Sequence, residues 1–211
     1  MTDNATANPT ISEIMRTSAV IPVLVIDDAA TAAPLAEALV AGGLRVLEVT
    51  MRTPAALDAI REMKRVPGAI VGAGTVVNAA QFAQVMDAGA EFIVSPGLTE
   101  RLAGPIIDSG VPFLPGIANA ADIMTGLDLG LTHFKFFPAE ANGGLKALKA
   151  LAAPFYQCSF CPTGGITEAS APEWLAFGPV LCVGGSWVTP KGASMPEVEA
   201  LASAASSLKS Q

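Results

Sequence analysis

The feature that most constrains the fold of this chain is a repeated alternation of short apolar runs with Ala- and Leu-rich helical stretches. The apolar runs recur at intervals of roughly 20–25 residues, which is the length of one strand–helix unit. Glycines stand where the helices should end and lead into the following strands, and Thr53-Pro54 and Asn78 are typical of helix N-caps. The pattern predicts strands at residues 21–26, 45–50, 69–73, 91–95, 112–114, 133–137, 159–161 and 180–183.

Eight strand–helix units in 211 residues predict one α/β domain, a (β/α)8 TIM barrel over residues 11–211. A short helix over residues 11–15 precedes the first strand, and we expect residues 1–10 to be disordered or loosely ordered. The alternative is an open doubly wound sheet in which Gly72-Ala73-Gly74 begins a dinucleotide fingerprint. The barrel is favoured because Val77 stands where that fingerprint requires its third glycine.

Composition excludes several classes of function. The net charge of −7 argues against binding to nucleic acid and to anionic membranes. No targeting signal is evident, and no apolar run approaches the roughly 20 residues that span a bilayer, so we expect a cytoplasmic protein. Cys158 and Cys161 have CxxC spacing, but with one histidine and no second pair they do not predict a metal site. We interpret the cysteines as reduced core thiols.

Lys135 is the most unusual side chain, because it stands in a short apolar run that ends at Pro138. Lysine is almost never fully buried without a partner, and burial of an amine favours its neutral, nucleophilic form. That form is the one needed for Schiff-base chemistry on a carbonyl substrate. His133 shares the face of Lys135 but lies deeper in the barrel, and we interpret it as structural.

Functional residues of such barrels lie at the carboxyl ends of the strands. Glu48 and Arg52 have the same period-two phase in the second strand, so they should face the same side. A buried Glu48–Lys135 pair could be structural, but opposite charges at ligand-facing strand ends favour a catalytic pair. Arg52 suits a clamp for a carboxylate, and Thr75 presents a hydroxyl at the end of the third strand.

Two glycine pairs follow the last two strands. Gly164-Gly165 and Gly184-Gly185 let backbone N–H groups approach a ligand closely, and Thr163 and Ser186 add hydroxyls beside them. Phosphate groups bind at this position in many barrels of this type. Tight turns alone would also explain the glycines, but two adjacent loops of this kind favour a phosphate site.

These motifs, taken together and in this order, resemble the class I 2-keto-3-deoxy-6-phosphogluconate (KDPG) aldolases, which often also act on 4-hydroxy-2-oxoglutarate (KHG). The resemblance covers about residues 12–190, and its motifs are segments 46–53, 71–76, 95–97, 134–140, 161–166 and 184–187. It implies a (β/α)8 barrel, a homotrimer, and no metal or organic cofactor.

The resemblance also implies a role for each motif residue. Lys135 is similar to the Schiff-base lysine of the family and Glu48 to its acid–base residue. Arg52 and Thr75 are similar to the contacts of the pyruvate carboxylate, with Pro96 and Phe137 lining the pocket. The residues that resemble the phosphate end are Thr163, Gly164, Gly165, Gly184, Gly185 and Ser186.

The activity implied is cleavage of KDPG to pyruvate and D-glyceraldehyde 3-phosphate, as in the Entner–Doudoroff pathway of carbohydrate metabolism, with KHG as a second substrate. Three alternatives stay open. One is an aldolase for the phosphogalactonate epimer, and another is a phosphosugar epimerase or isomerase that forms no covalent adduct. The third is a non-catalytic phosphosugar-binding or assembly protein.

Overall fold

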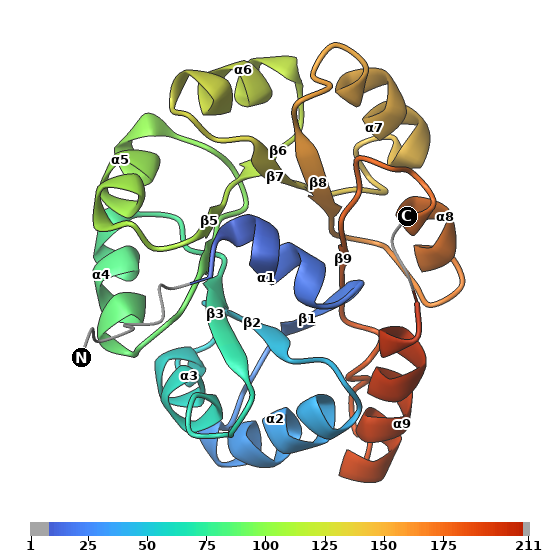
Figure 1. Cartoon of the computed structure of the whole chain (residues 1–211). Coiled ribbons are helices and arrows are strands. Elements are labelled where there is room, and N and C mark those ends of the chain that lie inside the picture. The colour runs from blue at the N-terminus through green and yellow to red at the C-terminus, as the bar shows by residue number, and fades with distance from the viewer. Residues whose placement is uncertain (1–8, 209–211) are drawn as a thin grey trace, which may run out of the picture.

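The computed structural model describes residues 9–208, and Figure 1 shows its strands grouped at the centre with helices around them. The helices are α1 (Ile11–Thr17), α2 (Ala32–Ala41), α3 (Ala56–Met63), α4 (Ala79–Asp87), α5 (Glu100–Ser109), α6 (Ala120–Asp128), α7 (Gly144–Ala152), α8 (Ala171–Leu175) and α9 (Met195–Ser206), with a 3-10 turn, η1 (Ala29–Thr31). The strands are β1 (Val20–Leu24), β2 (Val46–Thr50), β3 (Ile70–Gly74), β4 (Ile93–Val94), β5 (Phe113–Leu114), β6 (Gly116–Ile117), β7 (His133–Phe136), β8 (Ser159–Pro162) and β9 (Val183–Gly185).

The strands form two parallel sheets. One has the order β5-β4-β3-β2-β1-β9 and the other has the order β6-β7-β8. Isolated parallel bridges, Phe160 to Val180 and Thr163 to Gly184, connect β8 with β9 and the segment before it. The predicted α/β class with parallel strands and intervening helices is therefore confirmed.

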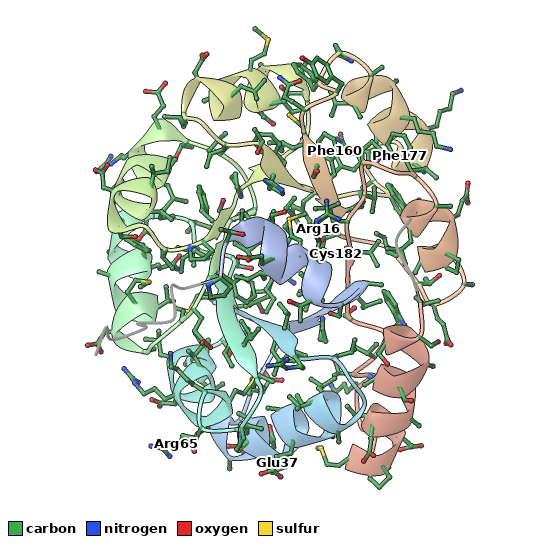
Figure 2. The ribbon with its side chains drawn as sticks, viewed as in Figure 1. Arg16, Glu37, Arg65, Phe160, Phe177 and Cys182 are labelled. Carbon is green, nitrogen blue, oxygen red and sulfur yellow. The ribbon has the colours of Figure 1, made fainter. Side chains whose placement is uncertain are left out.

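Two apolar layers hold these elements together. The larger cluster packs the helices against the outside of the strands. A smaller inner cluster joins Ile14 and Met15 of α1 to Ile21 and Val46, which lie at the amino ends of β1 and β2, and it includes Cys182 (Figure 2). The predicted N-terminal helix thus covers the amino ends of the strands, and the carboxyl ends are left to form the site.

The amino end of α1 is held by a capping box. The Glu13 carboxylate accepts from the Thr10 backbone N–H at 2.7 Å, and the Thr10 hydroxyl accepts from the Glu13 N–H at 3.3 Å. Such reciprocal bonds satisfy the unpaired N–H groups of a first helical turn. The loose order predicted for residues 1–10 concerns mainly residues 1–8, which lie outside the described residues.

Several local expectations need correction. Thr53 does not cap α3, which begins at Ala56 with Ala55 as its N-cap, because the Thr53 hydroxyl donates to the Ile26 carbonyl instead. The fifth predicted strand, residues 112–114, is β5, and a further short strand that was not predicted, β6, follows it after Pro115, which has no N–H to donate. The last strand is Val183–Gly185 rather than residues 180–183, since its pairing with β1 begins at Val20.

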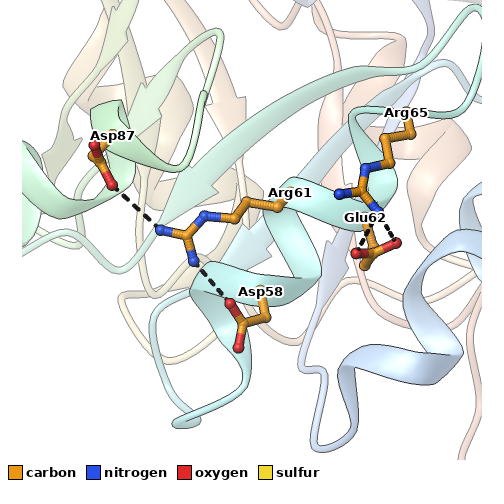
Figure 3. Close-up of polar contacts among 5 residues, drawn as sticks. All are labelled: Asp58, Arg61, Glu62, Arg65 and Asp87. Atoms are coloured by element: carbon orange, nitrogen blue, oxygen red, sulfur yellow. Dashed lines mark hydrogen bonds and ion pairs between the residues drawn. The ribbon is translucent and has the colours of Figure 1, made fainter.

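Ion pairs on the surface lie along α3 and the residues that follow it, and one of them reaches α4. Arg61 of α3 contacts Asp58 at 2.7 Å and reaches Asp87 of α4 at 3.3 Å, while Arg65 pairs with Glu62 (Figure 3). All five side chains are at least 38% exposed, so each pair contributes at most about 1 kcal/mol. The apolar clusters therefore dominate the stability of the fold.

The structure also tests the composition-based expectations. Cys158, Cys161 and Cys182 are free and buried, as expected for core thiols. Burial raises the pKa of the Cys158 thiol. The pKa of the Cys182 thiol is raised mainly by a hydrogen bond with Cys161 and further by burial, so both thiols stay protonated. Across residues 9–208, no helix has the length and apolar character to cross a membrane.

Candidate active site

Glu48 of β2 and Lys135 of β7 meet in the interior of the molecule. Lys135 Nζ donates to Glu48 Oε1 at 2.9 Å, and the two side chains are only 6% and 4% exposed. The Lys135 ammonium also lies 5.4 Å from the centre of the Phe137 ring. Taking two charges out of water costs several kcal/mol per ion before their attraction is counted. A pair so placed is weak evidence for stability and better evidence for a reactive site.

Glycines of β3 make room for the side chains of the interior. A Cβ on Gly74 would overlap the Glu48 carboxylate, and a Cβ on Gly72 would overlap the Phe92 ring. β2 and β3 are in register with Glu48 opposite Gly72 and Thr50 opposite Gly74. The Gly72-Ala73-Gly74 element therefore serves packing, and Gly74 lets Glu48 lie where Lys135 can reach it.

Arg52 lies just beyond β2, beside Thr75 at the end of β3. Arg52 Nε donates to Thr75 Oγ1 at 3.4 Å. Thr50, which has the same strand phase, is buried and donates its hydroxyl to the Leu24 carbonyl at 2.8 Å. Arg52 and Thr75 thus remain as the polar groups at this rim, close to the carboxyl ends of β2 and β3.

A cavity of about 310 Å³ opens at the carboxyl ends of the strands. It contains eight of the residues predicted from the sequence, and it adds Val23, Val25 and Ile166, which were not predicted. The lining residues are Val23, Val25, Arg52, Phe137, Thr163, Gly164, Gly165, Ile166, Gly184, Gly185 and Ser186. In β2, the charged Glu48 indicates which face of the strand points inward. The strand β1 carries no polar residue that could do the same, so nothing in the sequence indicated that Val23 and Val25 would line the cavity.

Volume alone does not identify the site. A larger surface hollow, of about 580 Å³, lies beside α9 and includes Lys191 and Glu197. That hollow contains no buried charged pair, whereas the smaller cavity shares Phe137 with the surroundings of Lys135. The chemistry of the side chains therefore favours the smaller cavity as the active site.

The loop of residues 163–166 presents unpaired backbone N–H groups. Gly164 and Gly165 have φ angles of +103° and +82°. Within residues 9–208, the N–H groups of Gly165 and Ile166 have no hydrogen-bond partner, whereas the Gly164 N–H takes part in the parallel bridge of Thr163 with Gly184. Successive N–H groups of this kind form a concave site for an anion.

The other glycine pair has a packing role as well. A Cβ on Gly184 would overlap the Thr163 side chain, and a Cβ on Gly185 would overlap the Trp187 ring. These two glycines are therefore required by their neighbours, whether or not a ligand approaches them. Gly184 lets β8 and β9 come close enough to place Thr163 at the cavity wall.

Pro96 does not line the cavity. A Cβ on Gly116 would overlap the Pro96 carbonyl group, so the loop after β4 lies directly against β6. Gly116 is in register with Lys135 on the next strand. Pro96 is thus on the side of Lys135 that is away from the glycine loops, near the reacting end rather than the open cavity.

His133 lies toward the opposite end of β7 from the cavity. It is half-buried, and its Nδ1 lies 3.1 Å from the Thr132 hydroxyl. Burial, assisted by the charge of Arg16 on α1, lowers its pKa, so it stays neutral at pH 7. Its placement agrees with a structural role. In the described part of the chain, no group of three or more His, Cys, Asp or Glu side chains is arranged to hold a metal ion.

Comparison with known proteins identifies the family. The profile of the KDPG and KHG aldolases matches residues 11–202. The 2-dehydro-3-deoxy-phosphogluconate aldolase of Zymomonas mobilis is 60% identical over 200 residues, covering 94% of this chain and 96% of the relative. This chain belongs to the KDPG and KHG aldolase family.

Solved structures of the family agree with this fold. The Zymomonas mobilis KDPG aldolase with 3-phosphoglycerate has a TM-score of 0.94 at 59% identity, covering 96% of this chain and 98% of that one. The Legionella pneumophila KDPG aldolase, with pyruvate captured as a covalent carbinolamine, has a TM-score of 0.91 at 45% identity, covering 94% and 99%. The same α/β architecture thus supports pyruvate chemistry in a family member.

Thr75 of this aldolase adopts a strained, left-handed backbone conformation. It is the one non-glycine residue in positions 9–208 with a positive φ, at +59°. A β-branched residue there is strained by about 1–3 kcal/mol. We predict that Thr75→Gly is more stable to urea than Thr75→Ala by about 1 kcal/mol, because only glycine relieves the strain.

The control is Ala150→Gly in the exposed part of α7, where glycine should instead cost about 0.5–1 kcal/mol. If Thr75→Ala were the more stable of the two Thr75 variants, the backbone at this position would carry no strain.

Proposed function

We propose that this protein is a class I aldolase that cleaves KDPG to pyruvate and D-glyceraldehyde 3-phosphate, and that it also cleaves KHG. The observation that carries the proposal is the buried hydrogen bond between Lys135 and Glu48 beside a cavity rich in backbone donors. A reactive amine with an acid–base partner suits the ketone, and the donor-rich cavity suits the phosphate.

Lys135 is the nucleophile in this reaction. Its hydrogen bond gives the Nζ proton a direct route to Glu48 Oε1, which leaves a neutral amine to attack the C2 ketone. The carbinolamine that forms loses its hydroxyl group as water, which takes the proton held by Glu48, so a protonated imine forms and Glu48 is again a carboxylate. The imine is an electron sink, so the reaction requires no metal and no organic cofactor.

Glu48 is the acid–base residue. Its carboxylate, directly or through a water molecule, removes the proton of the C4 hydroxyl. The C3–C4 bond breaks, its electron pair moves into the imine to form an enamine, and glyceraldehyde 3-phosphate leaves as the aldehyde. The enamine then takes a proton at C3 from Glu48, and hydrolysis of the imine releases pyruvate and restores Lys135.

Two groups of residues hold the substrate at its ends. Arg52 and Thr75 bind the carboxylate next to the reacting ketone, with Pro96 and Phe137 as the apolar walls of the pyruvate pocket. At the far end of the cavity, the phosphate binds Thr163, Gly164, Gly165, Gly184, Gly185 and Ser186. The unpaired N–H groups of Gly165 and Ile166 support this assignment, because a phosphate would satisfy them.

The architecture of the enzyme belongs to the same proposal. We infer a single domain over residues 11–211, in which the strands close into an eight-stranded (β/α)8 TIM barrel with β5 and β6 as one interrupted strand. The two bridges between β8 and the region of β9 support closure. We further infer a homotrimer, supported by the exposed apolar side chains of Val77 and Met124, and a cytoplasmic location, supported by free core thiols.

The gluconate substrate is favoured over its galactonate epimer by the family members of high identity. The Zymomonas mobilis relative at 60% identity acts on the phosphogluconate, while a KDPGal structure is only 26% identical to this chain. A phosphosugar epimerase or isomerase, and a non-catalytic binding protein, would leave the buried Lys135–Glu48 pair without a covalent role.

Borohydride trapping tests the covalent step. The protein is incubated with pyruvate and sodium borohydride, digested, and mapped by mass spectrometry. We predict a reduced pyruvyl adduct on the peptide that carries Lys135. Lys135→Gln, which keeps a donor for Glu48, should lose the adduct, and Lys146→Met on the exposed face of α7 should keep it. An adduct that is absent, or that maps to another lysine, contradicts the proposal.

Glu48→Gln tests the acid–base step separately. The amide keeps the shape of the side chain but cannot accept the C4 hydroxyl proton, so turnover of KDPG should fall by about 10²–10⁴-fold. The pyruvyl adduct should still form on Lys135. Full turnover in this variant, measured by coupled pyruvate release, would show that another group moves the proton.

A further inference from the structure

Glu140 lies behind the loop of residues 163–166 and does not line the cavity. It belongs to the segment between β7 and α7, whose backbone is bonded to that loop. The Ala139 N–H donates to the Thr163 carbonyl at 2.8 Å, and the Glu140 N–H donates to the Gly164 carbonyl at 3.0 Å. The two segments therefore move as one unit at this point.

The side chain of Glu140 packs directly on Gly165. A Cβ on Gly165 would lie 2.7 Å from both Cβ and Cγ of Glu140, which is closer than non-bonded carbon atoms approach. Gly165 is consequently held between the cavity on one side and the Glu140 stem on the other. The Cβ and Cγ atoms of Glu140 therefore limit how far the unpaired N–H groups of this loop can move away from a ligand in the cavity.

The carboxylate of Glu140 is tied to the core by Trp174. Trp174 Nε1 donates to Glu140 Oε1 at 3.3 Å. The indole belongs to α8, is 2% exposed, and has its ring 6.4 Å from the ring of Phe136 on β7. Because Trp174 is almost fully buried and packs against Phe136, its N–H group gives the Glu140 side chain a fixed anchor.

We propose that Glu140 is a positioning residue for the phosphate end of the substrate. Its side chain holds the backbone of Gly165 at the cavity wall, in the position that phosphate binding requires. This inference rests on the proposed function, because it assigns the loop to a phosphate. Glu140 acts on the far end of the substrate only, since Lys135 and Glu48 make their contacts with other residues. Its effect is therefore limited to phosphorylated substrates.

Truncation of Glu140 should change the affinity for the phosphate in opposite directions, depending on whether Glu140 acts by holding the loop or by its charge. A carboxylate near a phosphate dianion repels it, so if charge were the main effect, Glu140→Ala would tighten binding. If the stem and the bond to Trp174 hold the loop, Glu140→Ala weakens binding, and Glu140→Gln restores it because glutamine keeps the stem and an acceptor oxygen.

The experiment measures kcat and KM of full-length Glu140→Ala, Glu140→Gln and wild type with KDPG and with the unphosphorylated KHG. We expect Glu140→Ala to raise KM for KDPG roughly five- to tenfold, the effect of one lost hydrogen bond, with KM for KHG unchanged. Glu140→Gln should stay within about twofold of wild type. Glu173→Ala removes an exposed charge from α8, beside Trp174, and serves as the matched control.

A lower KM for KDPG in Glu140→Ala, or equal changes with KDPG and KHG, overturns the inference. A failure of the proposed function is seen separately, because the wild-type protein would then form no pyruvyl adduct on Lys135. If the adduct forms but the ratio of the KM values for KDPG and KHG is the same in Glu140→Ala as in wild type, the role of Glu140 is rejected and the proposed function stands.

Discussion

The buried hydrogen bond between Lys135 and Glu48 is the interaction around which the proposed site is built. It joins strands 87 residues apart in sequence and holds two charges that are almost fully removed from water. The register of β2 with β3 and the missing side chain at Gly74 are what allow the Glu48 carboxylate to occupy this position. Without that space, the carboxylate would have to turn away from Lys135, and burial of the lysine would lack its compensating partner.

The proposed site has two parts. The Lys135–Glu48 pair comes from strands β7 and β2, and the cavity beside it is lined in part by the loop of residues 163–166 with its backbone N–H groups. Backbone donors have fixed charge and no rotamers to lose, so their strength depends on how well the loop is supported. Glu140 contacts this loop at Gly165 and is bonded to Trp174, and in the role proposed for Glu140 these residues outside the cavity would affect what it binds.

Much of this organisation could be predicted from the sequence, and the limits are physical. Period-two phase placed Glu48 and Lys135 on interior faces, and glycines at helix ends marked the strand–helix boundaries. The role of Gly74 could not be predicted, because it depends on which side chain lies across from it in the folded sheet. The same applies to Val23 and Val25, apolar residues on an apolar strand, and to the hydrogen bond of Thr53 with Ile26, which displaced an expected helix cap.

A crystal structure of the protein soaked with pyruvate tests whether Lys135 forms the covalent bond. We expect continuous density between Lys135 Nζ and C2 of pyruvate, the carboxylate against Arg52 and Thr75, and a Glu48 oxygen within hydrogen-bond reach of the adduct. Pyruvate bound without a covalent bond to Lys135, or an adduct from which the Glu48 carboxylate has turned away, would contradict it.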